Sequence, residues 1–164
     1  MKSWQFGLVG LGGAVIITAL LYLAGENRMA KLHGEITSVR ILGVERRAAV
    51  AIVDFRATNL SDVLFVAGNR KVVVIGEHGE WHEGIISSSF DLKQLFKYFP
   101  ALGAMSHEPY VEGLKLKPGQ SVAGILAARF AMSKTELDMR REVVLQIYDV
   151  DGSLTEFNLV RPER

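Results

Sequence analysis

AAVAIVDFRA, residues 48–57, has the two-residue period of a β-strand from Val50 onward. In a strand, successive side chains point to opposite faces of the sheet. One face therefore holds Val50, Ile52 and Asp54, and the other holds Ala51, Val53 and Phe55.

Further strand-like segments lie on both sides of this stretch and are separated by turn residues. The turn signals are Asn59-Leu60-Ser61-Asp62, His78-Gly79 and Asp151-Gly152. The predicted strands are Ile36–Val44, Ala48–Ala57, Val63–Ala67, Arg70–Ile75, Glu80–Gly84, Gln120–Phe130, Val143–Val150 and Ser153–Val160. Short strands at such intervals predict a mainly β fold, an antiparallel β-sandwich.

Two helical insertions are expected within the sandwich, at about 88–102 and 134–141. In the first, Ser88 and Asp91 resemble a capping box and Pro100 ends the helix. Its apolar face holds Leu92, Leu95, Phe96 and Phe99. In the second, Ser133 and Glu136 form a capping box. Residues 101–112 carry few regular signals and are predicted to form a loop.

Residues 53–62, VDFRATNLSD, and 116–121, LKPGQS, form strand-and-turn elements that resemble a known group. They are similar to elements of immunoglobulin-like or fibronectin-III-like domains in bacterial single-pass membrane-anchored proteins of unknown function. The resemblance implies an immunoglobulin-like sandwich. The helix at 90–99 departs from that simple pattern and is the specialised part of the domain.

FGLVGLGGAVIITALLYLA, residues 6–24, is a run of 19 residues without a charge. As a helix it would reach about 28 Å, close to the thickness of a bilayer core. We expect residues 1–33 to form a tail, a transmembrane helix and a polar link, and residues 34–164 to form the sandwich. The alternative is a cleaved signal peptide, although the run is long for one and no small-residue cleavage site closes it. With the amino terminus inside, the domain would lie in the periplasm, anchored to a bacterial inner membrane.

Small residues cluster within this apolar run. Residues three and four apart share a helix face, and a face of small residues lets another helix approach closely. The residues concerned are Gly7, Gly10, Gly13 and Ala14. They are candidates for lateral contact with a partner helix.

Charge and cysteine content exclude several classes of function. The chain has 19 basic and 18 acidic residues, a formal net charge of +1 and no cysteine. Without a concentrated basic patch we expect no nucleic-acid partner. Without cysteine there is no disulfide, zinc-thiolate site or thiol nucleophile.

No group of residues stands out as catalytic. Ser87, Ser88 and Ser89 are explained by a loop and a helix cap, and no Gly-x-Ser-x-Gly elbow is present. The acidic residues around Asp151 are better explained by a β-turn than by a calcium loop. Asn59-Leu60-Ser61 matches an N-glycosylation sequon, but it also forms an ordinary turn. We therefore expect no enzyme activity and no cofactor.

Histidines and carboxylates gather in residues 77–83, where imidazole could bind a transition metal. His78 and His82 are weak candidates for ligands, because a hairpin does not ensure that they converge.

The first helical insertion holds more aromatic side chains than one apolar stripe of a short helix needs. Aromatic residues are enriched at interface hot spots. The candidates for binding a partner in this insertion are therefore Phe90, Phe96, Tyr98 and Phe99.

These observations favour a non-catalytic accessory or assembly subunit of a larger membrane complex, for example a respiratory or photosynthetic one. Its partners would be the lipid bilayer and other subunits, with no small-molecule ligand expected. The alternative is a membrane-anchored periplasmic sensor that binds a solute or a metal. An anchored hydrolase is a third hypothesis.

Overall fold

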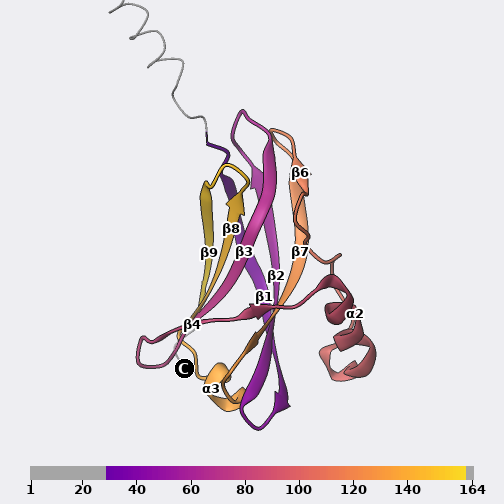
Figure 1. Ribbon diagram of the computed structural model, residues 1–164, viewed down its shortest axis with the longest axis vertical. Coiled ribbons are helices and arrows are strands. Elements are labelled where there is room, and N and C mark those ends of the chain that lie inside the picture. The colour runs from indigo at the N-terminus through magenta and orange to yellow at the C-terminus, as the bar shows by residue number, and fades with distance from the viewer. Residues whose placement is uncertain (1–28, 162–164) are drawn as a thin grey trace, which may run out of the picture.

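The computed structural model describes residues 29–161, and this part of the chain forms two β-sheets that pack face to face (Figure 1). The first sheet has the strand order β1-β2-β7-β5, and the second has the order β4-β3-β8-β9 with β6 paired to β3. All pairings between these strands are antiparallel. The mainly β, antiparallel fold expected from the sequence is confirmed.

The first sheet is built around β2 (Ala48–Asn59), which contains the alternating stretch. β2 pairs along its length with β1 (Leu32–Glu45) on one side and with β7 (Ser121–Phe130) on the other. The short β5 (Ile85–Ile86) pairs with the other edge of β7. β2 is therefore a central strand, in keeping with its apolar residues on both faces.

The second sheet is centred on β3 (Phe65–Ile75) and β8 (Glu142–Asp149). β9 (Leu154–Val160) pairs with β8. β4 (Trp81–Glu83) pairs with the end of β3, and β6 (Lys115–Leu116) pairs with its start. β4 is an edge strand of the second sheet and β5 is an edge strand of the first. The chain therefore crosses from one sheet to the other at Gly84.

Both hairpin turns expected from Gly-containing dipeptides are present. Gly79 lies between β3 and β4 with φ 88°, and Gly152 lies between β8 and β9 with φ 87°. Residues with a Cβ are disfavoured at such φ values, so glycine is the residue suited to these turns.

The alternation in β2 decides which side chains form the core between the sheets. Ala51, Val53 and Phe55, which the sequence pattern places on one face, are each 0% exposed and belong to this core. The Phe55 ring lies 5.2 Å from Tyr110, edge to face, and 6.2 Å from Phe157, stacked. Full burial of such side chains contributes about 1.5–3 kcal/mol each.

Three short helices interrupt the strands: α2 (Ser89–Tyr98), the 3₁₀ helix η1 (Pro100–Leu102) and α3 (Lys134–Asp138). Ser88 caps α2 by accepting a hydrogen bond from the Asp91 backbone N–H. Ser133 and Glu136 form both halves of a capping box on α3. Helices lie in both expected insertions, although α3 ends at Asp138, three residues before the expected end. The Ser133 capping box is confirmed, whereas Asp91 forms only half of the expected box at Ser88, since its carboxylate accepts a hydrogen bond from the Ser88 hydroxyl.

The strand boundaries differ from the prediction in three places. Val63–Ala67 and Arg70–Ile75 were expected as two strands, but Phe65–Ala67 and Arg70–Ile75 belong to the single strand β3, and Val63 and Leu64 lie in the turn before it. A register shift between Ala67 and Arg70 bends the strand without ending it. β1 begins at Leu32, inside the expected polar link. β5 and β6 were not foreseen, because two-residue strands are too short to show a period.

The expected transmembrane helix, the tail and the small residues Gly7, Gly10, Gly13 and Ala14 lie outside the described residues. Within 29–161, no helix is both long enough and apolar enough to span a bilayer.

A test of the β1–β2 pairing uses Gly34, where the backbones approach closely. A Cβ built on Gly34 would lie 2.0 Å from the Arg56 carbonyl oxygen, so a strand must shift to admit it. We expect Gly34→Ala to lower the free energy of unfolding by about 1–3 kcal/mol, the usual cost of overpacking. Urea unfolding of the full chain in mild detergent, followed by circular dichroism, measures this loss.

Gly43→Ala, in the same strand, is the matched control. Its added Cβ would lie 3.2 Å from the Cβ of Lys134, a contact that needs a shift of only a few tenths of an ångström and is far milder than the contact at Gly34. Equal losses in the two variants would contradict the proposed close contact at Gly34.

Candidate functional site

The helical insertion between β5 and β7 covers part of the outer face of the first sheet, the face that points away from the second sheet (Figure 1). Leu92 of α2 and Leu102 of η1 are buried there against Val50 and Ile52 of β2. These two β2 residues belong to the face opposite the sandwich core, as the alternation predicts. The insertion therefore packs on a sheet face and gives the domain a second, smaller hydrophobic cluster.

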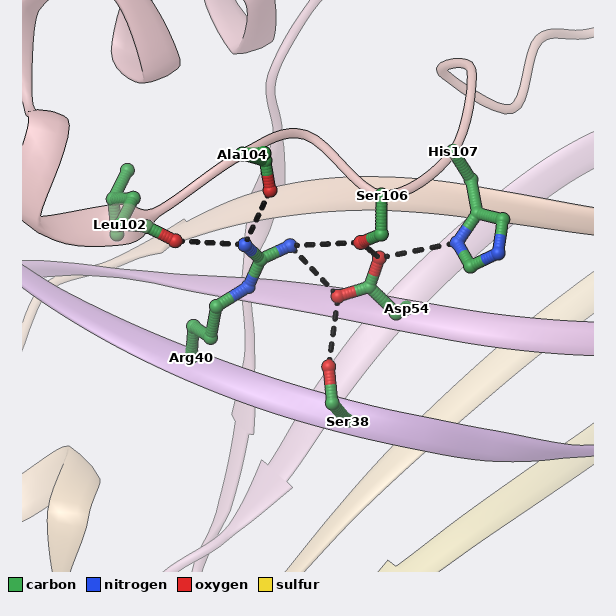
Figure 2. A network of polar contacts seen from close by, with 7 residues as sticks. All are labelled: Ser38, Arg40, Asp54, Leu102, Ala104, Ser106 and His107. Carbon is green, nitrogen blue, oxygen red and sulfur yellow. Dashed lines mark hydrogen bonds and ion pairs between the residues drawn. The ribbon is translucent and has the colours of Figure 1, made fainter.

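A polar cluster lies next to this second core, and it consists of Ser38, Arg40, Asp54, Ser106 and His107 (Figure 2). We call it the Asp54 cluster. Asp54 continues the outer face of β2 and is only 2% exposed. Ser38 and Arg40 come from β1, whereas Ser106 and His107 come from the segment that follows η1. The cluster thus joins two strands to the returning end of the insertion.

Both carboxylate oxygens of Asp54 are occupied by side chains. Oδ2 accepts hydrogen bonds from Ser38 Oγ and from Arg40 Nη2, each at 2.8 Å. Oδ1 accepts a hydrogen bond from Ser106 Oγ at 2.6 Å, and His107 Nδ1 lies 3.4 Å away. These partners replace the water that a buried carboxylate loses.

The pKa of Asp54 results from opposing effects. Burial raises the pKa, but the hydrogen bonds from Ser106 and Ser38 and the charge of Arg40 outweigh burial and hold the pKa below its ordinary value of 3.8. Asp54 is consequently ionised across the physiological pH range. A carboxylate enclosed in this way favours a structural role over proton transfer.

Arg40 links the Asp54 cluster to the insertion itself. Its Nη1 donates to the carbonyl oxygens of Leu102 and Ala104, at 2.8 and 3.2 Å (Figure 2). Its guanidinium also lies 4.9 Å from the centre of the Phe96 ring on α2. One arginine therefore holds both α2 and the backbone after η1 against the sheet.

The aromatic residues expected to bind a partner divide into two groups. Phe96 packs against the second core and Arg40, whereas Phe90 and Tyr98 are 68% and 67% exposed. Phe99, at 36% exposed, lies at the end of α2. The helix thus uses one side for the sheet and presents three aromatic side chains to solvent.

A groove runs between α2 and the lower part of the first sheet. Its cavity has a volume of about 410 Å³, and Val44, Leu95, Tyr98, Phe99 and Arg129 are among its lining residues. It combines exposed apolar surface with a charged guanidinium. Such a surface, with aromatic walls and a polar edge, is typical of sites that bind another protein.

The metal candidates His78 and His82 lie at the opposite end of the molecule from the turn after β2. His82 Nε2 is 3.9 Å from Glu80 Oε1. Across residues 29–161, no three His, Cys, Asp or Glu side chains are grouped so as to hold a metal ion. The structure therefore gives the metal-sensor hypothesis no specific support.

The sequon at Asn59 and the acidic stretch around Asp151 both have structural roles in turns. Asn59 of the sequon is 0% exposed, and its Nδ2 donates to the carbonyl oxygens of Val63 and Leu116 at 2.8 and 2.9 Å. A glycan cannot reach it in the folded domain. Asp149, at the end of β8, accepts a hydrogen bond from the Val66 N–H at 2.6 Å and another from the Asp151 N–H, so the acidic stretch serves the turn.

Sequence reasoning missed the Asp54 cluster. The available signal was a carboxylate on a strand face that otherwise holds Val50 and Ile52. A charge at such a place requires partners, but the sequence does not identify them.

Removal of the Asp54 charge should destabilise the protein in a pH-dependent way. Asp54→Asn leaves Arg40 without its counter-charge, so we expect the free energy of unfolding near neutral pH to fall by about 2–3 kcal/mol. Because the folded pKa is depressed, the wild-type advantage is present above the unfolded value of 3.8 and is lost as the pH falls below it. Denaturant unfolding from about pH 7 to about pH 2 measures both effects.

Asp151→Asn is the matched control, since Asp151 is exposed in a turn. It should change stability little at any pH. A gap between wild type and Asp54→Asn that stays constant down to the lowest pH would contradict the assigned role.

The sequence matches no protein-family model and no curated protein. Among solved structures it is similar to the archaellum periplasmic stator protein FlaG from Sulfolobus acidocaldarius, with 14% identity and a TM-score of 0.34 over 80% of this chain and 100% of that chain. It is also similar to the stator protein complex FlaF and FlaG from the same organism, with 12% identity and a TM-score of 0.32 over 82% and 92% of the two chains. Both TM-scores are low, so the description of the fold rests on the strand pairing of this chain.

Proposed function

We propose that this chain is a non-catalytic, membrane-anchored subunit that binds another protein of a membrane complex through α2. The proposal rests on one observation: α2 is packed firmly on the sheet and yet carries exposed aromatic side chains. Leu92, Phe96 and Arg40 fix one side of the helix to the sheet, whereas Phe90 and Tyr98 are exposed. Phe99, directly after the helix, lines the groove beside Tyr98. Exposed aromatic side chains on a fixed element are suited to binding.

The attachment of α2 favours binding for an energetic reason. An element that is already ordered loses little conformational freedom when a partner docks, so more of the contact energy appears as affinity. Arg40 contacts the Phe96 ring on α2 and donates hydrogen bonds to the carbonyl oxygens of Leu102 and Ala104, which follow the helix in the insertion. The groove beside Tyr98, with a volume of about 410 Å³, offers the partner a concave surface.

The membrane part of the proposal rests on the sequence. The charge-free run Phe6–Ala24 is long enough to cross a bilayer core as a helix. We propose that it anchors the domain on the outer side of a cell membrane and that Gly7, Gly10, Gly13 and Ala14 contact a partner helix. Three finer points remain predictions: that the membrane is a bacterial inner membrane, that the domain is an immunoglobulin-like domain in the periplasm, and that the complex is a respiratory or photosynthetic one.

The absence of enzyme activity is likewise part of the proposal. The most enclosed carboxylate, Asp54, has both oxygens engaged by side chains that hold the insertion in place. This environment supports a role for Asp54 in holding the insertion in position on the sheet.

Truncation of one exposed aromatic residue on α2 should weaken partner binding without unfolding the domain. We expect Tyr98→Ala to reduce co-purification of the native partner by about tenfold or more, because hot-spot residues contribute about 2 kcal/mol or more. The thermal unfolding midpoint should change little, since Tyr98 is 67% exposed. Quantitative mass spectrometry after gentle detergent extraction measures the ratio of partner to subunit.

Trp81→Ala is the control, because Trp81 is 62% exposed but lies on β4 of the second sheet. It should leave co-purification unchanged. If both variants retain the partner, or both lose it equally, α2 is not the binding surface.

A further inference from the structure

One end of the sandwich gathers the start of the described chain and three turns. Leu32 pairs with Asn59, the last residue of β2, and Asn59 in turn is hydrogen-bonded to Gln120. The Val150 N–H donates to the carbonyl oxygen of Val66, near the start of β3. Residues 29–32 and the turns 59–64, 117–120 and 150–153 therefore lie together, and we call this group the entry end (Figure 1).

The turns of the entry end carry apolar residues at exposed positions. Leu60 is 68% exposed, Val150 60% and Leu64 46%, and Met29 beside them is 51% exposed. Turn tips in a water-soluble domain are normally polar, so apolar side chains on two separate turns at one end require a reason.

Charged residues surround these apolar tips. Lys31, Lys115 and Lys117 are exposed at the entry end, alongside Asp62 and Asp151. Lysine side chains can reach lipid phosphates while neighbouring apolar groups enter the interface. At the other end of the sandwich, the tips of the β1–β2 and β3–β4 turns carry the exposed charged or polar residues Arg46, Arg47, Glu77, His78 and Glu80. Exposed apolar residues at that end, such as Val44 and Trp81, lie beside these tips and not on them.

The sequence places a hydrophobic segment close to this end. Four residues, 25–28, separate Ala24, the end of the apolar run, from Met29, so the two are five Cα–Cα steps apart. Even fully extended, this stretch reaches at most about 17 Å. If the apolar run crosses a membrane, the entry end cannot move far from the lipid headgroups.

We infer that the entry end rests on the bilayer surface, with Leu60 and Val150 inserted among the lipid headgroups. This inference rests on the proposed membrane anchor and adds a second contact with the bilayer. Two contacts restrict how the domain tilts. The end of β2 then lies at the membrane and its start lies away from it, and α2 packs near Ile52, about 23 Å along the strand from Asn59. The partner surface on α2 is thereby presented above the headgroups.

The test uses the complete chain, which has no native cysteine and accepts single labels cleanly. Leu60→Cys and Val150→Cys each receive an environment-sensitive fluorophore, and each labelled protein is reconstituted in vesicles of equal parts phosphatidylcholine and phosphatidylglycerol. A nitroxide on the lipid headgroup quenches a fluorophore only at short range. We expect quenching at both positions to be several-fold stronger than at His78→Cys, the control on an exposed turn at the opposite end.

Quenching at residues 60 and 150 that equals quenching at residue 78 would overturn the inference. Flotation of the same vesicles in a density gradient separates this failure from failure of the anchor. A chain that floats without selective quenching is anchored but stands clear of the surface, which refutes only the second contact. A chain that does not float refutes the anchor and the second contact together.

Discussion

The ion pair between Asp54 and Arg40 is the constraint on which the arrangement of the insertion depends. A carboxylate that is 2% exposed is tolerated only where charges and hydrogen-bond donors replace water. Ser38 and Arg40 supply two of these donors from β1, and Ser106 supplies a third from the far side of the insertion. The burial of Asp54 therefore requires that the segment after η1 lie across the sheet.

The same requirement fixes the surface that we propose for binding. Arg40 pairs with Asp54 and contacts the ring of Phe96, so the position of α2 is coupled to the charge in the sheet. The apolar contacts of Leu92 and Leu102 hold the helix down, while the polar contacts decide where the chain returns. In this position of the helix, Tyr98 is exposed beside the groove.

The sequence predicts those features that depend on neighbouring residues. The two faces of β2, the glycine turns at Gly79 and Gly152 and the capping box at Ser133 all follow local rules, and all are present. The Asp54 cluster could not be predicted, because Arg40 and Ser106 lie 14 and 52 residues from Asp54 and come together only when the sheet and the insertion pack. The continuity of β3 depends likewise on its register with β8, which no local pattern specifies.

Native-state hydrogen exchange in the Arg40→Met variant tests most directly whether this ion pair holds α2 in place. The variant keeps the length of the side chain and removes its charge. The account predicts that the amides of α2, such as Leu95 and Phe99, exchange at least about tenfold faster than in the wild type, while those of β8 change much less. Both amides are hydrogen-bonded within or at the end of the helix, so they report its opening. Equal changes in α2 and β8, or unchanged protection of α2, would contradict the account.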